Sequence, residues 1–333
     1  MERIRSQRVA ALAILGLVLA GVLALGEEPV FRVDVNLVRI LATVKDDSGR
    51  LIGTLEKSDF AVWDDGTPQQ LAIFERRTEQ PLSIALLVDT SLSTAIDLRY
   101  EMDSVERFLR AVFSEGNPKD AVALYSFSYD VTLRASFTGD RSKLESAARA
   151  MRPQSGTSLY DAIFLASRDL DTREGRRVMI LVTDGGDTTS AKNFHQALEA
   201  AQRADAVLYA ILVMPIKSDV GRNIGGENAL TMLSAGTGGR VFTPSLGTAL
   251  DEALSAILKE LRTQYYLAYY PKDSKQSGDR YHKLEVKVLR PDLRVFARNG
   301  YYEETEATPK LRPGRWHPAT KTPQGVDQDG KEK

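Results

Sequence analysis

The chain has 333 residues, with 44 Lys and Arg against 45 Asp and Glu, three histidines and no cysteine. The lack of cysteine excludes a thiol nucleophile, a disulfide framework and any cysteine-liganded zinc or iron–sulfur site. A histidine-only zinc site would need nearly all of His195, His282 and His317. The formal charge of −1 gives no electrostatic reason to expect a nucleic-acid partner, and the length suggests about two domains. Oxygen atoms are therefore the expected ligands of any bound metal.

The amino terminus has the layout of a targeting segment. Three arginines precede an uncharged apolar run over residues 9–25, and the small residues Ala24 and Gly26 come just before Glu27. This order predicts a secretory signal in residues 1–26. The alternatives are an uncleaved membrane anchor through residues 9–25, with its arginines in the cytoplasm, and a buried structural helix. A signal or an anchor makes the rest of the chain an exported protein: periplasmic, secreted or held at the inner membrane.

The next segment, residues 27–79, carries strand patterns. Its alternating apolar side chains change phase near Leu37, which suggests a bulge or a strand break. Residues 60–63 and 71–74 are expected to form a hairpin around the Asp65-Gly66 turn.

The middle of the chain alternates short apolar strands with amphipathic helices. Residues 84–89 are a continuous apolar run, typical of a strand buried on both faces of a parallel sheet. A short connection makes residues 121–127 and 131–137 an antiparallel hairpin. Further strands are expected at residues 178–183, 207–213 and 240–242, and helices at 102–113, 144–151, 159–170, 194–203, 227–235 and 250–261. The alternation predicts a doubly wound α/β fold around a mostly parallel six-stranded sheet.

Strand patterns return after the last helix, in residues 264–302. Neither flank makes a convincing core by itself, and the two ends of an inserted domain lie close together. We therefore expect residues 27–79 and 264–302 to form one small β-sandwich, into which an α/β domain of residues 80–263 is inserted. Residues 303–333, rich in proline and charge and poor in apolar periodicity, are expected to be a disordered tail.

Polar loops follow two strands that should lie side by side. Asp89, Ser91 and Ser93 form a D-x-S-x-S loop after the first strand of the sheet, Asp184 follows the fourth, and Thr157 precedes the helix between them. In a doubly wound sheet such loops meet in the crevice beyond the carboxyl ends of the strands. Carboxylate and hydroxyl oxygens suit Mg²⁺ or Mn²⁺, and five such ligands leave one coordination position open to a partner's oxygen atom. Helix capping and turn formation are the structural alternative for the same residues.

The three loops resemble the metal-ion-dependent adhesion site of von Willebrand factor type A domains. The resemblance covers roughly residues 82–262, and all five ligand positions match. Leu92 and Ser155 stand where bacterial members often have glycine, but neither position supplies a ligand. The flanks also resemble bacterial exported proteins described as VWFA-related. The resemblance implies cation-dependent protein binding, with the partner supplying an Asp or Glu carboxylate.

Other functions compete with this interpretation. A magnesium-dependent phosphatase of the haloacid dehalogenase type would also use Asp89, but Ser91 stands where that chemistry needs a second Asp as general acid. A serine hydrolase needs a histidine near its serine, whereas His195 is expected inside a helix. A further alternative is a structural scaffold with a vestigial metal loop. We expect an exported, non-enzymatic, cation-dependent interaction protein.

Overall fold

The computed structural model describes residues 37–76, 79–92, 94, 98–213, 223–244, 248–272 and 281–303. The predicted targeting segment and the predicted tail beyond Glu303 lie outside these ranges, as does the part of the first flank before Leu37. Within them, no helix combines the length and the apolar character needed to cross a membrane.

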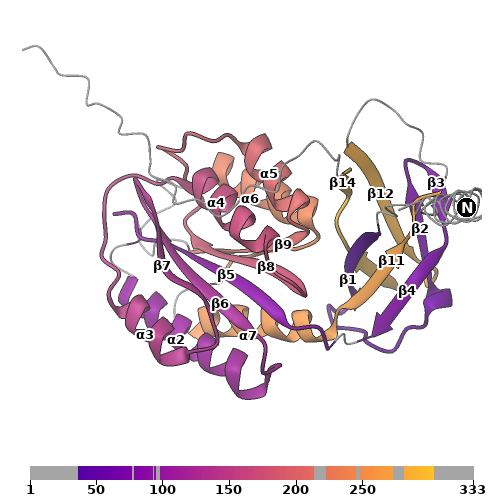
Figure 1. Ribbon diagram of the computed structural model, residues 1–333, viewed down its shortest axis with the longest axis horizontal. Helices are drawn as coiled ribbons and strands as arrows, with labels where there is room; N and C mark the ends of the chain where they lie inside the picture. The colour runs from indigo at the N-terminus through magenta and orange to yellow at the C-terminus, as the bar shows by residue number, and fades with distance from the viewer. Residues whose placement is uncertain are drawn as a thin grey trace, which may run out of the picture. The chain divides into compact units, whose positions relative to one another are not determined.

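A six-stranded sheet with helices on both faces forms the α/β part of the chain (Figure 1). Its strand order is β10-β9-β8-β5-β6-β7, in which β7 is antiparallel to β6 and the other neighbours are parallel. The predicted α/β fold class is thus confirmed. The strands are β5 (Leu82–Asp89), β6 (Ala121–Phe127), β7 (Val131–Thr138), β8 (Arg176–Thr183), β9 (Ala206–Leu212) and β10 (Val241–Phe242).

The two faces of this sheet are covered by different helices. Ile84 and Leu86 on β5 share one apolar cluster with the stripes of α2 (Leu98–Glu115), α3 (Arg141–Arg149) and α7 (Thr248–Thr263). Ala85 and Leu87 belong to a second cluster with the helices α4 (Leu159–Asp171), α5 (Phe194–Arg203) and α6 (Ile224–Thr237). Successive side chains of a strand point to opposite faces, so β5 is buried along its whole length and reads as a continuous apolar run.

The flanks form two four-stranded antiparallel sheets, β13-β1-β11-β4 and β14-β12-β2-β3. Each sheet combines strands from before and after the central sheet. Apolar residues of both sheets, among them Ile40, Val62 and Leu267, pack in one cluster, as in a β-sandwich. The strands are β1 (Val38–Asp46), β2 (Phe60–Asp64), β3 (Thr67–Gln69), β4 (Leu71–Arg76), β11 (Tyr265–Tyr269), β12 (Tyr281–Val288), β13 (Leu293–Phe296) and β14 (Gly300–Tyr302); a 3-10 turn, η1 (Lys57–Asp59), precedes β2.

The expected hairpin between residues 60–63 and 71–74 is wrong in its second strand. Asp65 and Gly66 both have positive φ, at 46° and 80°, so they form a tight two-residue turn. Such a turn pairs the residues directly beside it, and Asp64 is opposite Thr67 in the β2–β3 ladder. Strand β4, which contains residues 71–74, pairs with β11 in the other sheet.

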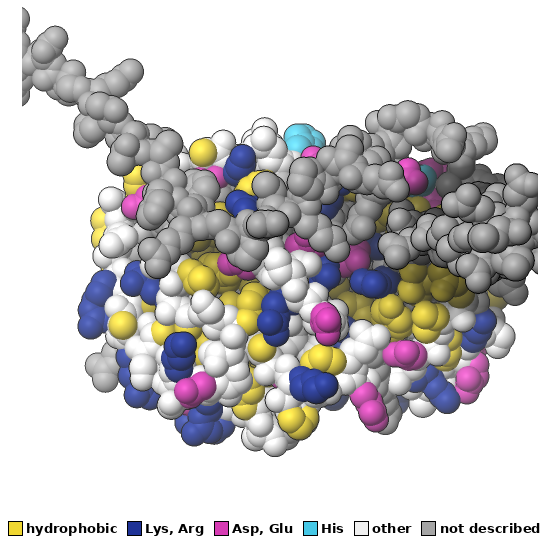
Figure 2. Space-filling model, in the orientation of Figure 1, with side chains coloured by type: hydrophobic (Ala, Val, Ile, Leu, Met, Phe, Trp, Pro, Cys, Tyr) yellow, Lys and Arg dark blue, Asp and Glu magenta, His cyan; other side chains and the backbone are white. Residues whose placement is uncertain are grey.

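Buried charges join the sandwich to the central α/β sheet. Glu260 on α7 accepts from Lys45 on β1 and from Arg240, and the Glu260 side chain is only 3% exposed. Gln264, between α7 and β11, donates to the hydroxyls of Thr43 and Tyr209. On the face shown in Figure 2, acidic and basic side chains are interspersed, in keeping with the nearly balanced charge.

Candidate metal site

Strands β5 and β8 end side by side, and their last residues are in direct contact. Asp89 ends β5 and is fully buried, while Thr183 ends β8. The Thr183 hydroxyl donates to Asp89 Oδ2 at 2.7 Å, and the Ser91 backbone N–H donates to Asp89 Oδ1 at 2.8 Å. Parallel pairing brings the carboxyl ends of the two strands to one edge of the sheet, so Asp184, the next residue after β8, lies at that edge too.

Backbone hydrogen bonds connect the three loops at this edge. The Gln154 N–H donates to the Thr90 carbonyl at 2.8 Å, which holds the segment before α4 against the loop after β5. The N–H groups of Thr188 and Thr189, in the loop after β8, donate to the Thr157 carbonyl at 2.8 and 3.2 Å. Backbone N–H and carbonyl groups, which do not depend on the side chains, therefore hold the Thr157 loop to both of the other loops.

A family model of the von Willebrand factor type A domain matches residues 84–187, which begin in β5 and include all three loops. The chain contains a von Willebrand factor type A domain. A search of the curated proteins found no significant match.

Solved structures resemble the chain at low sequence identity. BatB from Bacteroides thetaiotaomicron, described as a conserved hypothetical protein, is 18% identical with a TM-score of 0.44, covering 54% of this chain and 98% of its own. The vWF domain of the pilus tip protein Mfa5 from Porphyromonas gingivalis is 15% identical (TM-score 0.46; 55% and 97% covered). The pilus adhesin SpaC from Lactobacillus rhamnosus GG is 12% identical (TM-score 0.47), covering 73% of this chain and 47% of its own.

Four of the five predicted ligands lie in the described loops of the type A domain. Asp89 is buried at the end of β5, Ser91 is buried in the loop that follows, Thr157 is buried before α4, and Asp184 is half-buried after β8. The fifth, Ser93, lies outside the described residues. The assignment of all five as metal ligands stays a prediction.

The environment of Asp89 favours a cation in the type A domain. Burial, with a smaller contribution from the nearby charge of Asp184, raises the pKa of the Asp89 carboxyl to about 6, although hydrogen bonds from Thr183 and Ser91 act in the opposite direction. The ionised carboxylate therefore destabilises the fold by about 3 kcal/mol above pH 6, a cost that disappears below about pH 4, where Asp89 is protonated in both folded and unfolded chains. A divalent cation would offset this cost. Carboxylate and hydroxyl oxygens, the donors at hand, fit Mg²⁺ or Mn²⁺.

Two supporting hydroxyls were absent from the predicted set. Thr183 holds Asp89 Oδ2, and the Thr94 hydroxyl donates to the carbonyls of Asp89 and Ser91 at 3.1 and 3.0 Å. The sequence does carry a signal for Thr183: a hydroxyl residue ends the strand that pairs with the strand ending in Asp89.

Two exposed apolar side chains border the loops. Leu92, directly after Ser91, is 62% exposed, and Tyr129, whose N–H donates to the Ser155 carbonyl, is 48% exposed. Exposed apolar surface thus lies directly beside the candidate ligand loops.

A cavity of about 340 Å³ lies at the opposite edge of the sheet, where β8 and β9 begin. Arginines contribute strongly to its lining: Arg39, Arg173, Arg176, Arg177 and Arg298. It is separate from the loops at the carboxyl ends of the strands and is not part of the candidate metal site.

Proposed function

We propose that the type A domain binds Mg²⁺ or Mn²⁺ through Asp89, Ser91, Ser93, Thr157 and Asp184, and that the chain is an exported protein-binding module and not an enzyme. The observation that carries the proposal is the buried Asp89 carboxylate at the junction of β5 and β8, in loops that backbone hydrogen bonds hold together. Its partner completes the coordination with an Asp or Glu carboxylate.

The charge balance supports this kind of partner. Two aspartates neutralise a divalent ion, while neutral hydroxyl ligands leave it electrophilic enough to attract an external carboxylate. Leu92 and Tyr129 offer exposed apolar contact area beside the candidate ligand loops. Interfaces commonly combine such apolar contacts with a few strong polar ones.

The wider organisation is a proposal of the same kind. The type A domain, residues 80–263, is inserted into a sandwich formed by residues 27–79 and 264–302, and mixed sheets from both flanks support this division. Residues 1–26 direct export, either as a cleaved signal or through an anchor at 9–25, and 303–333 form a tail.

Thermal melting with Mg²⁺ tests the metal claim. We expect chelator-treated wild type to gain several degrees in Tm with excess Mg²⁺, because a ligand that binds only the folded state stabilises it. Asp184→Asn should lose this gain and keep the hydrogen bond from the Gly186 N–H. Asp130→Asn, at an exposed carboxylate, is the matched control and should shift like wild type. An equal shift for Asp184→Asn would refute the site.

Binding and enzymatic roles are separated by two further measurements. Wild-type protein should capture a partner from the exported fraction with Mg²⁺ present, and both chelator and Asp184→Asn should abolish the capture. Turnover of generic phosphate esters that disappears in Asp89→Asn would instead favour the phosphatase alternative.

A further inference from the structure

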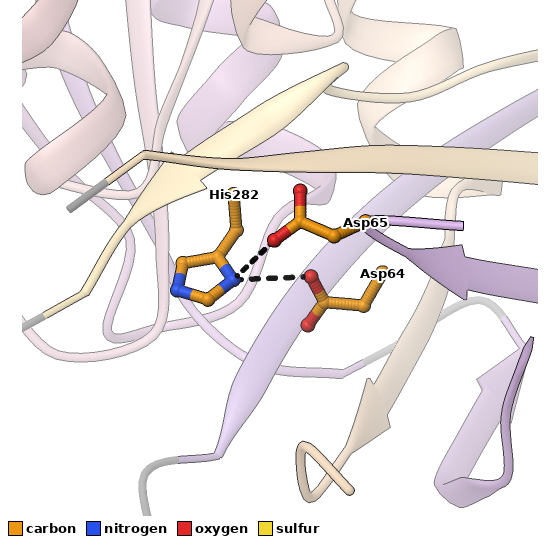
Figure 3. A group of neighbouring side chains, drawn as sticks. All are labelled: Asp64, Asp65 and His282. Carbon is orange, nitrogen blue, oxygen red and sulfur yellow. Dashed lines mark ion pairs between the residues drawn. The ribbon is translucent and has the colours of Figure 1, made fainter. Parts of the chain in front are cut away.

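A cluster of three ligating side chains lies in the β-sandwich, outside the type A domain. Asp64 ends β2, Asp65 begins the following turn, and His282 lies on β12, the antiparallel neighbour of β2. Figure 3 shows the three side chains pointing toward one another. His282 Nδ1 is 3.3 Å from Asp64 Oδ1 and 3.0 Å from Asp65 Oδ2, and one ligand atom from each residue lies within 4.8 Å of the others.

Two of these atoms are buried without a hydrogen-bond partner. Asp64 Oδ1 and His282 Nδ1 make no hydrogen bond within the described ranges, and their side chains are 0% and 5% exposed. Buried polar atoms are almost always satisfied, because leaving one unpaired costs about 1–3 kcal/mol. A cation bound between these two unsatisfied atoms would satisfy both of them.

The remaining oxygen of each carboxylate is already held. Asp64 Oδ2 accepts from the hydroxyls of Tyr269 and Tyr301, both at 2.8 Å. Asp65 Oδ1 accepts from the Lys283 N–H at 2.8 Å. These bonds turn the other oxygen of each aspartate toward His282, as outer partners orient the ligands of metal sites.

The spacing of the ligand atoms matches a small transition-metal ion. Metal–ligand distances of about 2.0–2.2 Å place neighbouring ligand atoms about 3.0 Å apart in an octahedron and about 3.4 Å apart in a tetrahedron. The observed separations of 3.0 and 3.3 Å lie in this range. One imidazole nitrogen and two carboxylate oxygens suit first-row divalent cations, and two carboxylates balance the charge of the ion.

We propose that Asp64, Asp65 and His282 bind a divalent cation of the first-row d-block metals, such as Zn²⁺. The site is independent of the proposed function of the type A domain. Asp65 is exposed, so water reaches the ion and fills its open positions. On the far side, His282 stacks on Tyr301 with ring centroids 4.8 Å apart, which holds the imidazole in place. The ion would connect β2 to β12, strands from opposite sides of the inserted domain, and so brace the sandwich.

Zinc titration of the full chain tests this site. We use Asp184→Asn as the parent protein, so that the proposed site of the type A domain is disabled and the two proposals can fail separately. Calorimetry should show one equivalent of Zn²⁺ bound, with a rise in Tm. Adding Asp65→Asn should weaken affinity at least tenfold and keep the fold, because Asn can still accept from the Lys283 N–H. Asp47→Asn, at an exposed aspartate elsewhere in the sandwich, should change nothing.

Two other variants separate ligands from supporting residues. His282→Gln should shift or abolish the visible absorption of bound Co²⁺, because this absorption depends on the number, kind and geometry of the ligands. Tyr301→Phe should weaken Zn²⁺ binding several-fold and leave the Co²⁺ spectrum in place, since Tyr301 positions Asp64 and does not ligate. Parent protein that binds no Zn²⁺, or binds it equally after Asp65→Asn, would overturn the proposal and identify the cluster as a simple ion pair.

Discussion

The two candidate cation sites are assembled in opposite ways. In the type A domain, the ends of neighbouring parallel strands bring candidate oxygen ligands, among them those of Asp89 and Asp184, to one edge of the sheet. In the sandwich, adjacent antiparallel strands from the two flanks bring Asp64 and Asp65 to His282. A parallel sheet collects short loop motifs at one edge, so the first site leaves a pattern in the sequence. Pairing between segments from before and after the central sheet leaves none, because the ligands share no local spacing.

The largest expected effect on stability concerns the junction between the two regions. Glu260→Ala removes the carboxylate that Lys45 and Arg240 share, leaving Lys45 as a buried, unpaired charge. We expect a loss of about 3–5 kcal/mol in the free energy of unfolding, measured by urea denaturation. The control is Glu285→Ala, which removes an exposed partner of Lys287 and should cost at most about 1 kcal/mol. Two separate transitions, only one of them shifted, would show that the regions unfold independently.

Glycine substitutions compare backbone crowding in the two regions. Gly156 has φ +79°, and an added Cβ would lie 3.1 Å from Tyr129 Cα. Gly49, in a turn of the sandwich, has φ +82° with open space around it. The left-handed conformation alone costs Ala about 1–2 kcal/mol, so we expect that loss for Gly49→Ala and about 2–4 kcal/mol for Gly156→Ala. Only Gly156→Ala should also weaken Mg²⁺ binding by calorimetry; unchanged binding would mean that the Thr157 loop does not shape the site.

The smallest expected effect concerns the hydroxyl that supports Asp89. Thr183→Val keeps the side-chain shape but removes the donor to Asp89 Oδ2, so metal-free protein should lose about 1–3 kcal/mol of stability. Thr231→Val is the matched control, because the Thr231 hydroxyl donates to the Glu227 carbonyl on the exposed face of α6. We expect its unfolding free energy to change by less than about 0.5 kcal/mol. Equal losses in the two variants would contradict a specific role for Thr183.

Much of the central sheet was predictable from local patterns. A continuous apolar run indicated β5, and an apolar stripe over residues 250–261 indicated α7, which extends from Thr248 to Thr263. The short connection after β6 required an antiparallel neighbour, and β7 is one. These elements were readable because burial imposes a period of two or 3.6 on residues that are close in sequence.

The sandwich was less predictable, although both flanks were correctly interpreted as strands. The prediction that residues 71–74 would pair with 60–63 failed because the turn at Asp65-Gly66 had already determined the partner of β2. His282 was considered only for a histidine-only zinc site. A mixed site of one histidine and two aspartates has no sequence signature when its ligands come from strands far apart in the chain.

The sequence by itself determined the α/β class, the flanking strands and the loops after β5 and β8, because each depends on periodicity or on a few adjacent residues. The tertiary structure decided which flank strands pair, that Thr183 supports Asp89, and that Glu260 lies between Lys45 and Arg240. It also placed His282 against Asp64 and Asp65. The residues in these contacts lie far apart in the sequence, so no local pattern predicts that they meet. Only packing of the whole chain brings them together.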